Sequence, residues 1–144
     1  MTGTATALRP VLAAALALLG AFSAAAMEQQ DRPITGAEFD AYTLGRTLTY
    51  GIGGQPYGIE RYLPDRRVIW RFLGEECREG QWFESGQQIC FVYDDEPGRQ
   101  HCWMFFLSPE GLRARFAGDP DGAELVEVEQ SDRPMMCPGE FLGA

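Results

Sequence analysis

Between residues 46 and 129, short segments with a two-residue period alternate with turn residues, and this pattern constrains the fold most strongly. In one of them Val68, Trp70 and Phe72 alternate with arginine and isoleucine, which is typical of a strand with one buried face. The pattern predicts about eight strands, at 46–50, 57–63, 67–72, 80–84, 87–93, 100–107, 112–116 and 124–129. We expect a mainly β protein, a small antiparallel up-and-down β-barrel, because closure protects sheet edges from further pairing; a two-layer sandwich is the alternative.

One short helix is expected before the first strand. Thr35 and Glu38 have the spacing of a capping box, in which each side chain satisfies a free backbone N–H at a helix start. Phe39 and Tyr42 are three residues apart and share a face, and Gly45 is suited to a left-handed stop. The sequence therefore predicts a helix over residues 36–44 that caps or flanks one end of the barrel.

The first 26 residues are typical of a cleaved secretory signal peptide. Arg9 is the only charge before residues 11–21, which are apolar apart from Gly20, and the small residues up to Ala26 suit a signal peptidase. The apolar run is roughly 11 residues, short of the roughly 20 that a spanning helix needs, so a permanent membrane anchor is the weaker alternative. We expect a periplasmic or secreted protein whose residues 27–144 form a single β-rich domain with an irregular tail at 130–144.

The four cysteines predict two disulfide bonds, because an even number in an exported chain usually pairs. If the turn between segments 87–93 and 100–107 is centred on Glu96, Cys90 lies opposite Cys102, within bonding range. Cys77 then pairs with Cys137 and ties the tail to the sheet. The sequence leaves the other two connectivities open.

Composition excludes several function classes. The net charge of −9 opposes binding to nucleic acid or anionic lipid. The chain has no lysine, which excludes Schiff-base catalysis and a P-loop, and His101 is its only histidine. The acidic run at 94–96 lacks the ligand spacing of a calcium loop and is interpreted as a solvated turn. We therefore predict no catalytic residue, no metal site and no cofactor, and hence no enzyme.

The hairpin of segments 87–93 and 100–107 is apolar on both faces. The predicted register places Phe91, Trp103 and Phe105 on one face and Val92, Met104 and Phe106 on the cysteine face. Either one face lies in the core while other segments cover its back, or one face lines a cavity for a ligand or partner. The candidate lining residues are Trp70, Trp82, Phe91 and Trp103.

Arginines at positions 61, 66, 67 and 71 form a basic concentration in this acidic chain. Guanidinium groups suit carboxylate or phosphate recognition, so Arg61, Arg67 and Arg71 are candidate anion contacts. Ion pairs with the neighbouring Glu60 and Asp65 are the alternative, because exposed arginines beside acids usually do no more than that.

Four stretches carry a resemblance to a known group: 57–70 (YGIERYLPDRRVIW), 77–82 (CREGQW), 89–93 (ICFVY) and 102–103 (CW). The chain resembles small exported alphaproteobacterial proteins of unknown function, over about half of residues 27–144. The resemblance implies a lipocalin-like, or calycin-like, β domain in the cell envelope, and it brings no catalytic residues.

The functional expectation is a non-enzymatic binding domain of the periplasm or secretome. Its partner would be a small apolar ligand or a protein. The alternative is a proteinaceous inhibitor of an envelope or extracellular hydrolase, acting through a loop such as residues 94–99. A cavity lined by tryptophans would favour the first, and a filled interior with projecting loops would favour the second.

Overall fold

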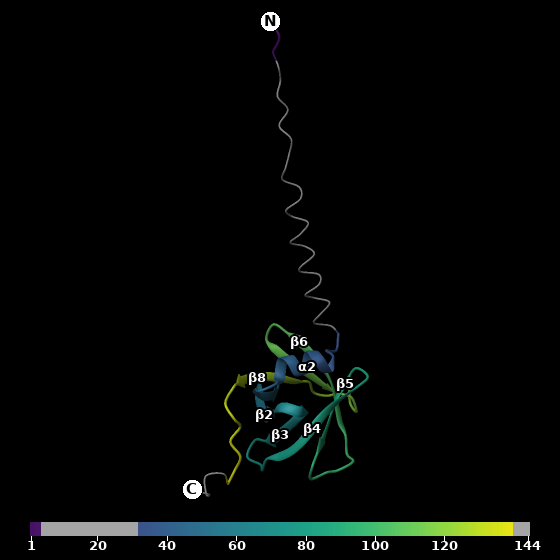
Figure 1. The fold of residues 1–144 in the computed structure, drawn as a ribbon, viewed down its shortest axis with the longest axis vertical. Coiled ribbons are helices and arrows are strands. Elements are labelled where there is room, and N and C mark those ends of the chain that lie inside the picture. Colours follow the sequence, from purple (N-terminus) through teal and green to yellow (C-terminus); the bar gives the residue numbers. More distant parts are fainter. Residues whose placement is uncertain (4–31, 140–144) are drawn as a thin grey trace. The chain divides into compact units, whose positions relative to one another are not determined.

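The eight predicted segments form strands of one closed, antiparallel up-and-down barrel in the computed structural model, which describes residues 1–3 and 32–139 (Figure 1). The strands are β1 (Thr47–Ile52), β2 (Gln55–Tyr62), β3 (Arg67–Phe72), β4 (Arg78–Ser85), β5 (Gln88–Tyr93), β6 (His101–Ser108), β7 (Gly111–Phe116) and β8 (Leu125–Ser131). Each strand pairs with its neighbour in sequence, and β1 pairs with β8 to close the sheet. The predicted barrel is confirmed, and the sandwich is not formed.

The helix α2 (Gly36–Thr43) begins at the predicted capping box. The Glu38 N–H donates to Thr35 Oγ1 at 3.2 Å, and the Thr35 N–H donates to Glu38 Oε2 at 2.8 Å. Gly45 adopts a φ of 79°, the left-handed conformation that ends a helix and that glycine adopts without strain. The helix ends one residue earlier than predicted.

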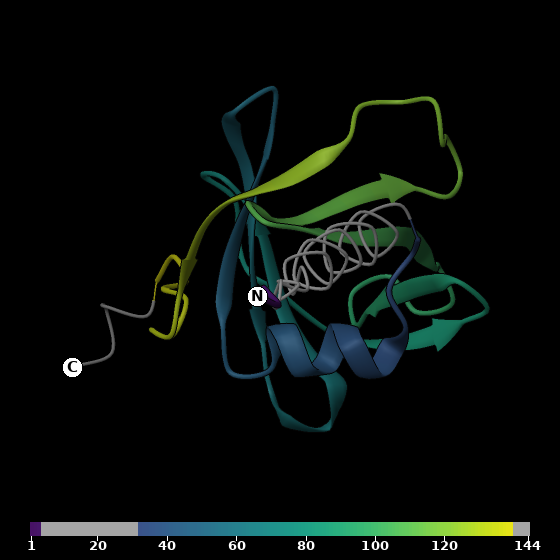
Figure 2. The same ribbon diagram turned by 90° about the horizontal axis from the view of Figure 1, so that it is seen from above.

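α2 closes one end of the barrel, because its Phe39 ring is fully buried inside it. The ring packs edge-on against Tyr62 and Trp82, with centroids 5.4 and 5.1 Å away, and in a tilted arrangement against Phe105, with centroids 4.6 Å apart. Figure 2 shows α2 at one end, while the β1–β2 hairpin tip and the yellow-green connection between β7 and β8 lie at the opposite end. We call this opposite end the mouth; the connections β1–β2, β3–β4, β5–β6 and β7–β8 surround it.

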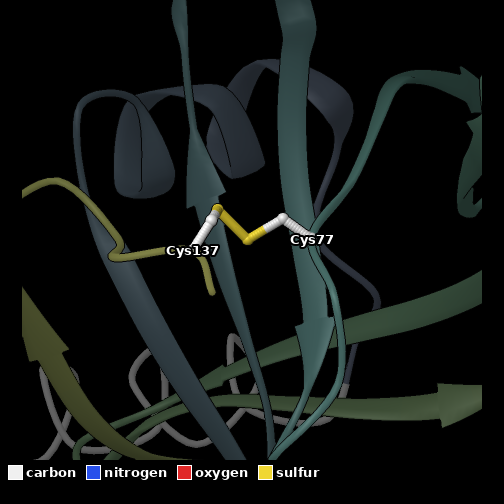
Figure 3. The surroundings of a disulfide bond; sticks show 2 residues. All are labelled: Cys77 and Cys137. Carbon is white, nitrogen blue, oxygen red and sulfur yellow. A yellow bond between two sulfur atoms is a disulfide. The ribbon is translucent and has the colours of Figure 1, made fainter. Parts of the chain in front are cut away.

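Both predicted disulfides are confirmed. Cys90 lies opposite Cys102 in the β5–β6 register, with their Cα atoms 4.0 Å apart. Cys77, directly before β4, bonds to Cys137 and ties the C-terminal segment to the outside of the barrel (Figure 3). On a chain-entropy model, closing loops of 12 and 60 residues stabilises the fold by about 3 and about 4 kcal/mol respectively.

The segment that follows β8 has no helix or strand from 132 to 139. Arg61 holds its start, donating from Nη1 to the carbonyl oxygens of Asp132 and Arg133 at 3.2 and 3.3 Å. Met135 is buried. The strand pairing of β8 extends to Ser131, so the irregular segment begins two residues later than predicted.

The predicted signal peptide lies, apart from residues 1–3, outside the described residues. Within the part of the chain that the structure describes, no helix is both long and apolar enough to span a lipid bilayer.

Candidate ligand-binding site in the barrel

The mouth contains a cavity of about 330 Å³, which is within the size range of small-molecule sites. Its walls are mainly apolar and come from strand ends and from the β7–β8 connection. The lining residues are Ile52, Tyr57, Phe72, His101, Trp103, Phe116, Asp119, Gly122, Ala123 and Leu125. Ile52 and Tyr57 are exposed at its rim. Apolar side chains of this size left in water around a concave surface are typical of a binding site.

A second, smaller cavity of about 40 Å³ lies deeper in the barrel. Trp103 and Leu125 line both cavities and therefore stand between them. The remaining walls of the inner cavity are Tyr50, Glu60, Trp70, Phe91, Tyr93, Phe105 and Ala114. Its volume exceeds the roughly 10–15 Å³ that one water molecule needs, so a water or a small polar group of a ligand fits there.

Glu60 is the only charged side chain among the residues that line the inner cavity, and it is 4% exposed. The β2–β3 register places it opposite Trp70, so it points inward like its partner. The Tyr93 hydroxyl donates to Glu60 Oε1 at 3.1 Å, and the Tyr62 hydroxyl donates to Oε2 at 3.3 Å. A carboxylate accepts about four hydrogen bonds, so Glu60 keeps acceptor capacity for another donor.

The hydroxyl of Tyr50 extends this network, lying 2.9 Å from that of Tyr62. When Glu60 is ionised, Tyr50 donates to Tyr62 and Tyr62 donates to Glu60. When Glu60 is protonated, the same contacts work in reverse, and the Tyr50 O–H becomes free to face the inner cavity. The network therefore satisfies either protonation state of the carboxyl group.

Burial raises the pKa of Glu60 to about 8, because its charge is removed from water; the hydrogen bonds from Tyr93 and Tyr62 offset only part of this rise. Desolvation likewise raises the pKa of Tyr50, Tyr62 and Tyr93, and the proximity of the Glu60 charge adds to the effect. A buried acid with a perturbed pKa beside a cavity is a frequent mark of a functional site. Burying a carboxyl group costs free energy of folding, and an apolar side chain at the same position would avoid that cost.

Trp70 reaches across the inner wall because position 58 is a glycine. Gly58 lies opposite Phe72 in the β2–β3 register, and a Cβ atom at Gly58 would overlap the Trp70 ring. The missing side chain therefore leaves room for the indole. Phe72 packs edge-on against Trp70 and against Tyr57, with centroids 5.3 Å apart in each case. These three rings form a continuous aromatic wall from the rim to Glu60.

The structure brings together three of the four predicted lining residues. Trp70 and Phe91 line the inner cavity, and Trp103 lines both cavities. Trp82 lies elsewhere, 2% exposed at the closed end between Phe39 and the guanidinium group of Arg66. It lines neither cavity.

The three predicted anion contacts lie on β2 and β3 and have different surroundings. Arg61 donates to backbone carbonyls of the chain's own loops, including Gly45 at 2.7 Å. Arg67 forms an ion pair with Asp94 at 2.8 Å. The Nε atom of Arg71 is buried without a hydrogen-bond partner among the described residues. The suggested ion pairing with Glu60 does not occur, because Glu60 is inside the barrel.

The acidic loop that follows β5 is held by arginines of the same chain. Arg78 pairs with Asp95 at 2.8 Å and with Glu96 at 2.7 Å, and lowers the pKa of both carboxyl groups. His101 Nε2 lies 3.5 Å from Glu96. Among residues 1–3 and 32–139, no group of three or more histidine, cysteine, aspartate or glutamate side chains is arranged to hold a metal ion.

Sequence reasoning missed Glu60 and its three tyrosines. The signal was present: a hairpin centred on the Pro64–Arg66 turn pairs residue 60 with residue 70, so Glu60 had to share the inward face of Trp70. The tyrosines come from β1, β2 and β5, and no sequence pattern relates them, because they meet only when the barrel closes.

Comparison with known proteins gives no guide to this site, since no family model, no curated protein and no solved structure matches the chain. The resemblance to small exported alphaproteobacterial proteins stays a prediction.

Proposed function

We propose that this protein is a non-enzymatic binding domain that takes a small, mainly apolar ligand into the mouth of its barrel. The observation that carries the proposal is the cavity of about 330 Å³, walled by Tyr57, Phe72, Trp103 and Phe116 and continued inward by the cavity at Glu60. Aromatic walls with a few convergent polar groups are the usual composition of ligand sites. A cavity among core side chains otherwise lowers the stability of a small domain.

Export to the periplasm or the extracellular medium belongs to the same proposal. It is supported by the two disulfide bonds, which form and persist in oxidising compartments, and by the predicted signal peptide. Recovery of the protein from the periplasm or the extracellular medium with all four cysteines oxidised is the expected result. Recovery from the cytosol with free thiols would contradict it.

The alternative, inhibition of a hydrolase through loop 94–99, receives less support. The carboxylates of Asp94, Asp95 and Glu96 are already paired with Arg67 and Arg78. An inhibitory contact through these groups would first have to break ion pairs within the chain.

Binding can be tested with N-phenyl-1-naphthylamine, an uncharged dye whose fluorescence rises in apolar sites. The disulfide-bonded protein is expected to bind it. Ile52→Arg places a charge at the rim, where the side chain is 38% exposed, and should weaken binding at least tenfold without unfolding the barrel. The matched control is Leu44→Arg, which changes an apolar residue that is 49% exposed at the closed end and should leave binding unchanged. Equal affinity in all three proteins would refute the proposal.

A further inference from the structure

Glu60 gives the site a chemical preference that its apolar walls alone do not have. A carboxyl group that is 4% exposed lies at the inner end of a cavity, and within the described part of the chain its hydrogen-bond donors are the hydroxyl groups of Tyr62 and Tyr93. The lining residues of the two cavities include no lysine or arginine, and Asp119 adds a second acid at the mouth. In a site whose lining residues include no lysine or arginine, a cationic ligand is the partner that would favour the ionised form of this carboxyl group.

The walls around Glu60 favour the same kind of partner. Trp70 and Trp103 present aromatic rings to the cavities, and the faces of such rings attract ammonium groups, most strongly where water is excluded. A ligand that ended in a carboxylate would place two acids together away from water. A neutral ligand could donate a hydrogen bond to Glu60 but would leave a buried carboxylate charge unpaired.

We infer that the ligand is an amine: an aromatic or apolar body held at the mouth, with a protonated amino group that reaches Glu60 between Trp103 and Leu125. This inference rests on the proposed binding function and specifies its ligand class. The inner cavity of about 40 Å³ accommodates an ammonium group and an adjoining methylene, and the outer cavity of about 330 Å³ accommodates the body. Glu60 then accepts from the ammonium group and from its two tyrosines at once.

Binding of such an amine has a defined proton balance. With the pKa of Glu60 at about 8 in the free protein, the carboxyl group is mainly protonated at pH 6.5, as is the amine in solution. The bound pair consists of an ammonium group and a carboxylate, so Glu60 releases its proton to solvent. The titratable groups that face Glu60 are Tyr50 from β1, Tyr62 from β2 and Tyr93 from β5, all of which stay neutral at this pH; Arg78 from β4 lies against the Tyr93 ring and stays charged.

Three indoles that differ only in their terminal group test the inference: tryptamine, tryptophol and indole-3-acetate. Titration calorimetry at pH 7 should give at least tenfold tighter binding for tryptamine than for tryptophol, and the weakest binding for indole-3-acetate. Glu60→Gln should abolish the preference for tryptamine over tryptophol. The control Glu129→Gln, which neutralises an exposed acid on β8, should retain the preference.

A second measurement uses only the native protein, so it does not depend on folding of the variant. At pH 6.5, titrations in buffers with different ionisation heats should show nearly one proton released per tryptamine bound and none per tryptophol. Two results would overturn the amine inference and leave the binding function standing. In the first, the protein binds the dye but binds tryptamine no more tightly than tryptophol. In the second, the protein binds the dye and none of the three indoles. If the protein binds neither the dye nor any of the three indoles, the amine inference and the proposed binding function are both overturned.

Discussion

The hydroxyl of Tyr93 donates to Oε1 of Glu60 across 3.1 Å, joining two residues that are 33 positions apart in the chain. The contact crosses the barrel interior from β5 to β2. It makes the buried acid Glu60 part of a hydrogen-bond network of tyrosine hydroxyl groups.

Stability should fall with pH because of Glu60. Its pKa is 4.5 in an exposed chain and about 8 in the fold, so the folded state binds a proton that the unfolded state has lost between these values. The stability associated with the protonated group is present below pH 4.5 and disappears as pH rises through 8. Urea unfolding should show the native protein losing on the order of 3–5 kcal/mol relative to Glu60→Gln between pH 4.5 and 9. A pH-independent difference between the two proteins would contradict the burial of an ionisable group.

Removal of the Tyr93 hydroxyl should raise the pKa of Glu60 further. Desolvation raises the pKa of Glu60, and the hydrogen bond from Tyr93 lowers it by stabilising the ionised carboxylate. Tyr93→Phe removes the hydrogen bond and keeps the desolvation. A ¹³C NMR titration of the Glu60 carboxyl carbon measures this directly. Tyr57→Phe, which removes a hydroxyl from a rim residue, serves as the control and should not change the midpoint. A lower titration midpoint in Tyr93→Phe would contradict the claim that this hydrogen bond stabilises the ionised form of Glu60.

Gly58→Ala should destabilise the fold by about 1–3 kcal/mol, because the new Cβ overlaps the Trp70 ring and small-to-large changes in a packed interior cost this much. Trp70→Leu removes the ring and should relieve the clash. In a double-mutant cycle of thermal or urea unfolding, the combined variant should therefore be more stable than the sum of the single changes predicts. Additive effects would mean that Gly58 is needed for its backbone alone.

The two disulfides should differ in their effect on binding. Replacing Cys77 and Cys137 by serine is expected to lower stability by about 2–4 kcal/mol in urea unfolding, with dye binding retained, since both cysteines lie outside the cavities. Replacing Cys90 and Cys102 by alanine should weaken dye binding, because their neighbours Phe91 and Trp103 line the inner cavity. The reverse pattern would place the binding site on the outside of the barrel.

Sequence patterns predicted the strands, the capping box and the Cys90–Cys102 disulfide because each depends on local spacing, and the Cys77–Cys137 pairing followed by elimination. The period of two places Val68 and Trp70 on one face whatever the rest of the chain does, and a turn centred on Glu96 is enough to set Cys90 opposite Cys102. The prediction that Trp82 lines a cavity was wrong. The alternation of residues along a strand shows which side chains point inward, but it does not show how far along the barrel axis each one lies. Trp82 faces inward but meets Phe39 of α2 at the closed end.

The sequence by itself determined that this chain forms short antiparallel strands and two disulfides, because periodicity, turn chemistry and cysteine spacing act over short range. It favoured the barrel over the sandwich, and the structure decided between them. Only the tertiary structure decided that Glu60 would lie among Tyr50, Tyr62 and Tyr93 beside a cavity. The physical reason is closure: side chains from three strands approach one another only when β1 pairs with β8, and the pKa of Glu60 is raised only when that closure excludes water from its charge.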